Sequence, residues 1–69
     1  MQVERLVYMA NQIGSYFISQ RGNDTDQRIA THLKRFWDPR MRKAIIAHVK
    51  QGGSGLDPVV KHAILLLEK

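Results

Sequence analysis

The chain has 69 residues, a formal net charge of +5 and no cysteine. A domain of this length buries only about 60% of the surface of its unfolded chain, and the lack of cysteine excludes disulfides and thiolate metal ligands. A single core below about 70–80 residues rarely supplies more than about 3–5 kcal/mol of stability. We therefore expect one domain, residues 1–69, that gains part of its stability from a partner.

The apolar segments are too short to span a membrane. The longest uninterrupted one covers residues 63–67, whereas a transmembrane helix needs about 18 apolar residues. Glu4 and Arg5 lie in the first turn and the N-terminus has no uncharged apolar run, so we expect no signal peptide. We therefore expect a cytoplasmic protein without membrane contact. Its positive charge suits nucleic acid or an acidic protein surface, but composition alone favours an ordinary solvated surface.

The first predicted helix covers residues 3–20. Its apolar residues recur every three or four positions and form one stripe: Leu6, Ala10, Ile13 and Phe17. Gly14 lies near the edge of this stripe, where it is explained either by close approach of another helix or as a tolerated glycine. Tyr8 projects away from the stripe and is a candidate contact with a partner. Residues 21–23, Arg-Gly-Asn, are expected to end the helix.

The second predicted helix begins after Asp24 or Thr25, either of which can cap it. Its apolar stripe contains Ile29, Leu33, Phe36 and Trp37. We expect Phe36 to belong to the core, and Trp37, at the edge of the stripe, to be shared between the core and a partner. Pro39 ends this helix, because the residue before a proline is disfavoured in the helical conformation.

Two Asp-Pro pairs predict the starts of the third and fourth helices, since Asp is a favoured N-cap and Pro a favoured first residue. These pairs begin at Asp38 and Asp57, and Gly52-Gly53 closes the third helix. The two apolar stripes are Met41, Ala44, Ile45, His48 and Val49, and then Val60, Ala63, Ile64 and Leu67. Leu65 lies outside the last stripe and is a second candidate contact. The sequence predicts an all-α, compact single domain of four short helices, with a sharp Asp-Pro junction between the second and third.

No arrangement of residues indicates catalysis or a metal site. The histidines, at positions 32, 48 and 62, include no pair at a helical i, i+4 spacing. His48 falls within an apolar stripe, which favours a buried, hydrogen-bonded core histidine, although its role is left open. The serines have no activating histidine nearby in the sequence, and helix starts account for at least three of the six carboxylates. We expect no catalytic residue, cofactor or metal.

Residues 34–43 combine five basic side chains with the only tryptophan. Basic residues among aromatic ones suit nucleic acid, through phosphate contacts and base stacking. However, the charges scatter around their helices, and Asp38 would repel phosphate. Trp and Arg are also enriched at the energetically important positions of protein interfaces. We therefore take Trp37, Arg40 and Arg42 as candidate interface residues, with a small basic helical nucleic-acid-binding module as the alternative.

Three blocks resemble the delta subunit of NAD-dependent formate dehydrogenase. They are Met-Ala-Asn-Gln-Ile at 9–13 with Tyr16-Phe17 after it, Phe-Trp-Asp-Pro-Arg-Met-Arg at 36–42, and Gly-Gly-Ser-Gly-Leu-Asp-Pro-Val at 52–59. Their order and spacing agree with that family, although Tyr16 stands where a second Phe is expected and residues 22–31 match no motif.

The resemblance implies a non-catalytic accessory subunit of a cytosolic formate dehydrogenase that contains molybdenum or tungsten. It also implies that the chain itself carries no cofactor and supports the assembly or stability of the larger, cofactor-bearing subunits. The larger subunits are then the expected partners. The sequence leaves open which of them is contacted, and whether the isolated chain self-associates.

Overall fold

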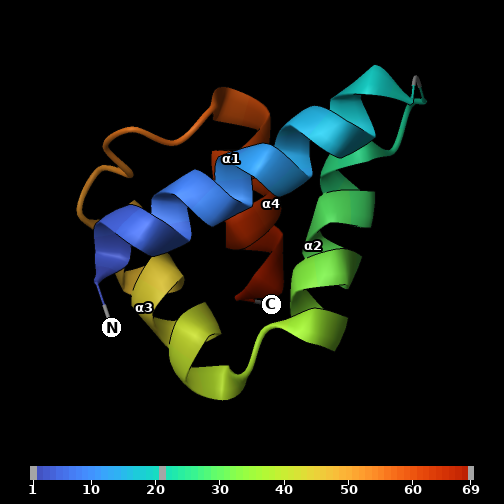
Figure 1. Ribbon diagram of the computed structural model, residues 1–69. Helices are drawn as coiled ribbons and strands as arrows, with labels where there is room; N and C mark the ends of the chain where they lie inside the picture. Colours follow the sequence, from blue (N-terminus) through green and yellow to red (C-terminus); the bar gives the residue numbers. More distant parts are fainter. Residues whose placement is uncertain (1, 21, 69) are drawn as a thin grey trace.

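The computed structural model describes residues 2–20 and 22–68, and in these residues it contains helices and no strand. The helices are α1 (Val3–Ser19), α2 (Thr25–Phe36), α3 (Pro39–Lys50) and α4 (Pro58–Leu67). α1 crosses the front of the molecule, and α4 lies behind it between α2 and α3 (Figure 1). The predicted all-α fold is confirmed, while Arg21, assigned to the end of the first helix, lies outside the described residues.

The core lies around α4, which packs against each of the other three helices. Because α4 is the most apolar of the helices, it can bury residues on more than one side. The buried apolar side chains come from all four helices and from two connections, and they are Leu6, Ala10, Ile29, Leu33, Trp37, Ile45, Val49, Leu56, Val60, Ala63 and Ile64. The predicted stripes therefore supply most of the core.

Gly14 marks the closest approach of α1 to α4. It is buried, and a Cβ atom added to it would lie 2.3 Å from Cγ2 of Val60. Such a distance is well below van der Waals contact. The sequence leaves two explanations for this glycine, close approach of another helix or simple tolerance. The structure supports close approach.

The three aspartates at helix starts differ in what their side chains do. Oδ1 of Asp38 accepts a hydrogen bond from the backbone N–H of Met41 at 2.9 Å, and so caps α3. Asp24 and Asp57 occupy the same position before α2 and α4, but neither side chain makes a capping hydrogen bond. The sequence thus predicts the helix starts correctly, whereas only one of the three carboxylates bonds as an N-cap.

The expectation that Phe36 belongs to the core is wrong, because its side chain is 69% exposed. Phe36 is the last residue of α2, and α1 diverges from α2 toward this end (Figure 1). No helix therefore covers the flank on which Phe36 lies. Trp37 follows in extended conformation and is only 5% exposed, so it is Trp37 that fills the core at this end.

The connection between α3 and α4 is held against the helices by side chains. Nε2 of His48 lies 2.8 Å from the carbonyl oxygen of Ser54, and Leu56 is buried. Asn11, on α1, donates to the carbonyl oxygen of Gly55 at 2.9 Å and accepts from the N–H of Asp57 at 3.0 Å. His48 is thus hydrogen-bonded as predicted, but it is half-buried rather than fully buried, because its ring faces this connection.

Candidate protein interface

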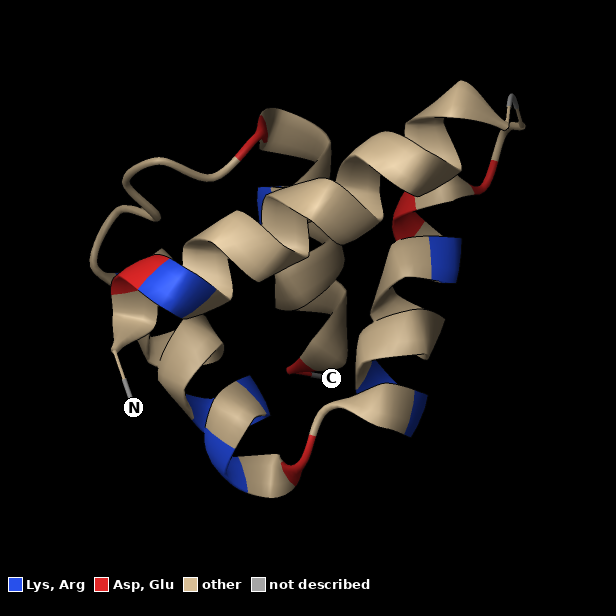
Figure 2. Cartoon of the chain, in the orientation of Figure 1, with Lys and Arg blue, Asp and Glu red and all other residues tan. Residues whose placement is uncertain are grey.

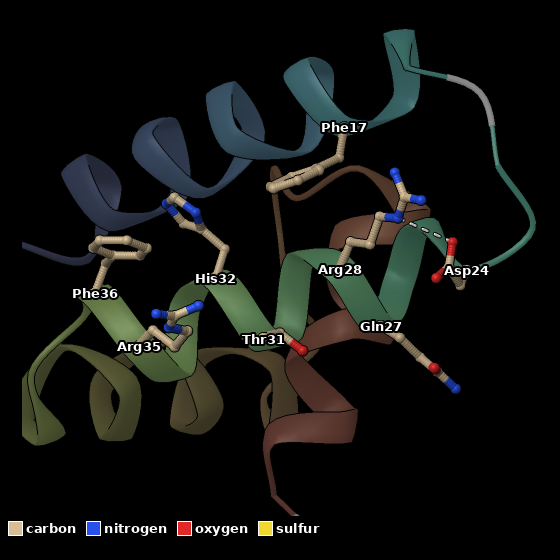
Figure 3. Close-up of a pocket in the computed structure, with 8 residues that line it drawn as sticks. All are labelled: Phe17, Asp24, Gln27, Arg28, Thr31, His32, Arg35 and Phe36. Atoms are coloured by element: carbon tan, nitrogen blue, oxygen red, sulfur yellow. Dashed lines mark ion pairs between the residues drawn. The ribbon is translucent and has the colours of Figure 1, made fainter.

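An open groove of about 350 Å³ runs along α2 beside Phe17 of α1, and aromatic rings form part of its lining. Phe17, from α1, packs edge to face on His32, with 5.7 Å between the ring centroids. His32 in turn packs on Phe36, with centroids 4.6 Å apart. Figure 3 shows the three rings in a row along α2. The spacing of four residues between His32 and Phe36 places both on one face of the helix.

Two arginines of α2 lie along the same groove. Nε of Arg28 pairs with Oδ1 of Asp24 at 3.1 Å near one end (Figure 3). Cζ of Arg35 lies 6.0 Å from the centroid of the Phe36 ring at the other end, which is within the range of a cation–π contact. The groove thus combines apolar and cationic groups, the mixture that is enriched at protein interfaces.

A second hollow, of about 630 Å³, lies beside the N-terminal half of α1. It is mainly apolar, and it is lined by Glu4, Arg5, Tyr8, Met9 and Met41. Tyr8 is 66% exposed. Methionine side chains adapt readily to different partners, so this hollow is a second surface on which an apolar side chain can be accommodated.

The predicted interface residues differ in how far their side chains are exposed. Tyr8 and Leu65 are exposed, as their helical spacing predicts. Arg40 is exposed, whereas Arg42 is half-buried, and its Nη1 donates to the carbonyl oxygen of Lys34 at 2.6 Å. Trp37 presents almost no surface. Contact of these residues with a partner stays a prediction, and Arg42 and Trp37 also hold the fold together.

Basic residues gather at one end of the molecule, around the turn between α2 and α3 (Figure 2). The hydrogen bond from Arg42 to Lys34 joins the two helices there. Asp38, the N-cap of α3, lies in this turn. The helical spacing of the basic residues indicates that they scatter around each helix. The turn, however, brings the end of α2 and the start of α3 close together.

Neither a metal cluster nor a membrane-spanning helix is found in the described part of the chain. Within residues 2–20 and 22–68, no three His, Cys, Asp or Glu side chains are placed to hold a metal ion together. His62 pairs with Asp26, with Nδ1 and Oδ2 2.7 Å apart, across α4 and α2. None of the helices described is long and apolar enough to cross a bilayer.

Helical spacing alone does not predict the aromatic groove, because Phe17 and Phe36 also fit the apolar stripes of their helices. In the structure Phe17 is half-buried and Phe36 exposed, and His32 lies between their rings. The detectable signal is the i, i+4 spacing of His32 and Phe36, next to Arg28 and Arg35 on the same helix. Only the divergence of α1 from α2 makes this face open rather than buried.

Fold and surface together define a small all-α domain that carries an aromatic groove and a methionine-lined hollow on its outside. The chain belongs to the family of the NADH-dependent formate dehydrogenase delta subunit, FdsD, whose family model matches residues 5–64. This match confirms the family that the three sequence blocks indicate. No match was found among curated proteins or among solved structures.

Proposed function

We propose that this chain is a non-catalytic accessory subunit that binds the larger subunits of an NAD-dependent formate dehydrogenase in the cytoplasm. The observation that carries the proposal is the family match over residues 5–64. In this role the chain supports the assembly or the stability of the subunits that hold the cofactors, and holds no cofactor itself.

The surface of the chain supports a binding role. Among the residues that the structure describes, the exposed large apolar side chains are Tyr8, Met9, Tyr16, Ile18, Phe36 and Leu65. Isolated exposed apolar residues are normal, but here several of them adjoin the groove and the hollow described above. A larger subunit that covers these places would remove apolar surface from water, which is favourable by roughly 25 cal/mol per Å².

The proposed interface combines Tyr8, Arg40 and Leu65 with the aromatic groove. Arg42 and Trp37 contribute in a different way, because they hold the end of α2 against α3 and so position the exposed Phe36. Binding of a partner to this end of the molecule would therefore depend on both residues, even though the partner does not contact the Trp37 ring.

The experiment compares the larger subunits produced with and without this chain. We expect the enzyme that lacks the chain to contain less molybdenum or tungsten per large subunit, or to lose activity at a lower temperature. The measurements are metal content by mass spectrometry and residual formate oxidation after heating. Equal metal content and equal heat resistance in the two preparations would contradict the accessory role.

A further inference from the structure

The two ends of the α1–α2 groove differ in charge balance. At one end, the guanidinium of Arg28 is neutralised by Asp24, at 3.1 Å. At the other end lies Arg35, and no carboxylate of the described residues forms an ion pair with it. Lys34 precedes it in the sequence. Arg35 is therefore a cation without an ion-pair partner among residues 2–20 and 22–68, and it lies at the Phe36 end of the groove.

The same end offers an apolar contact. Phe36 is 69% exposed, and its ring is supported from within by His32 and, through His32, by Phe17. Rings packed in this way lose less conformational freedom when a partner covers them than a mobile side chain would. Because the guanidinium of Arg35 lies 6.0 Å from the Phe36 ring, the cation and the apolar surface can be contacted by one short segment.

We propose that the Arg35–Phe36 end of the groove binds an acidic segment of a larger subunit, with a carboxylate on Arg35 and a neighbouring apolar side chain on Phe36. The inference rests on the proposed function and adds the chemistry of the partner. A guanidinium can bind a carboxylate through two parallel hydrogen bonds. The Asp24–Arg28 pair shows within the same groove that a carboxylate fits beside an arginine of this helix face.

An acidic protein segment suits this groove better than nucleic acid does. The three rings pack on one another at 4.6 and 5.7 Å, so a base cannot insert between them without separating them. Asp24 lines the other end of the groove and pairs with Arg28, so that end offers no unpaired cation to a second phosphate of a nucleic-acid chain. A protein segment needs only one carboxylate, at the Arg35 end.

The first test is a cross-link that only a nearby carboxylate can form. In Arg35→Lys, the positive charge is kept and an amine is introduced, which a carbodiimide joins to an Asp or Glu side chain as an amide. The variant is co-produced with the larger subunits, and the linked peptides of the purified complex are identified by mass spectrometry. We expect a link from position 35 to an Asp or Glu of a larger subunit. Links from the native lysines alone would overturn the inference.

The second test compares affinities with a matched control. Arg35→Glu and Phe36→Asp are each expected to weaken binding of the larger subunits by about tenfold or more, the range of important interface positions. Lys43→Glu makes the same change of charge as Arg35→Glu on an exposed position of α3 and should leave binding within about twofold. Arg35→Lys should retain most of the affinity. Equal losses in Arg35→Glu and Lys43→Glu would indicate general charge attraction and overturn the inference.

The outcomes also separate this inference from the proposed function. If the wild-type chain binds the larger subunits and both groove variants bind equally well, the groove inference fails while the accessory role stands. If the wild-type chain does not bind them, the accessory role itself fails. Loss of all association after nuclease treatment would point to nucleic acid and overturn both.

Discussion

Three aspartates precede helices α2, α3 and α4, yet only Asp38 bonds to its helix as an N-cap. Replacing a bonded N-cap with Ala typically costs about 1 kcal/mol, so Asp38→Ala should lower the free energy of unfolding by about that amount. Asp57→Ala is the matched control and should cost less, since no capping bond is lost. Urea denaturation of both variants measures the difference, and an equal or larger loss in Asp57→Ala would contradict this reading.

Replacing Gly14 with alanine is expected to destabilise the fold. In an ordinary helix interior, Gly→Ala stabilises by about 1 kcal/mol. Here the new Cβ would lie 2.3 Å from Cγ2 of Val60, and such overpacking costs typically about 1–3 kcal/mol. Gly14→Ala should therefore lower the melting temperature. The double variant with Val60→Ala should lose less than the sum of the two single losses. Strict additivity would show that the two side chains do not meet.

Arg40 and Arg42 should differ in their effect on stability. Arg42 donates to the carbonyl oxygen of Lys34, so Arg42→Glu removes a bond between α2 and α3 and should lower the melting temperature. Arg40 is exposed, and exposed substitutions usually change stability by no more than about 0.5 kcal/mol. Thermal melts of the two reversals are the measurement. The expectation fails if Arg40→Glu is the more damaging of the two.

At the scale of the elements, Asn11 joins α1 to the connection before α4. Its side-chain amide donates a hydrogen bond to the carbonyl oxygen of Gly55 and accepts one from the backbone N–H of Asp57. Asn11→Asp keeps an acceptor for the N–H of Asp57 but loses the donor to Gly55, whereas Asn11→Leu loses both bonds. A hydrogen bond of this kind contributes about 0.5–1.5 kcal/mol, and Asn11→Leu loses both of them, so it should destabilise more than Asn11→Asp. Amide exchange at Asp57 should become faster in Asn11→Leu, and unchanged exchange there would contradict the proposed link.

The helices themselves follow from local patterns, but their contacts do not. Apolar spacing and the two Asp-Pro pairs are sufficient to predict the four helices, because both act within a few residues of the chain. The role of Asn11 depends on atoms 44 and 46 positions away, and the burial of Leu56 depends on how the connection folds back. Such contacts depend on tertiary packing, so helical spacing alone does not predict them.

For the whole molecule, the exposed groove depends on how α1 and α2 diverge. Phe36 has the helical spacing of a core residue, and Trp37 the spacing of an edge residue, but the structure reverses their exposure. The reversal arises because α2 ends at Phe36 and the chain turns Trp37 inward. Local spacing therefore predicts which residues are apolar enough for a core, and the packing of neighbouring helices decides which of them a partner can reach.

The central claim is that this chain binds the larger subunits of a formate dehydrogenase, and co-purification tests it most directly. The chain is tagged and produced with the larger subunits, treated with nuclease and passed over a size-exclusion column at physiological salt. We predict that the chain elutes with the larger subunits in a fixed ratio, because salt screens exposed charges strongly but leaves apolar contacts in place. Elution of the chain alone, or association that disappears with nuclease, would contradict the claim.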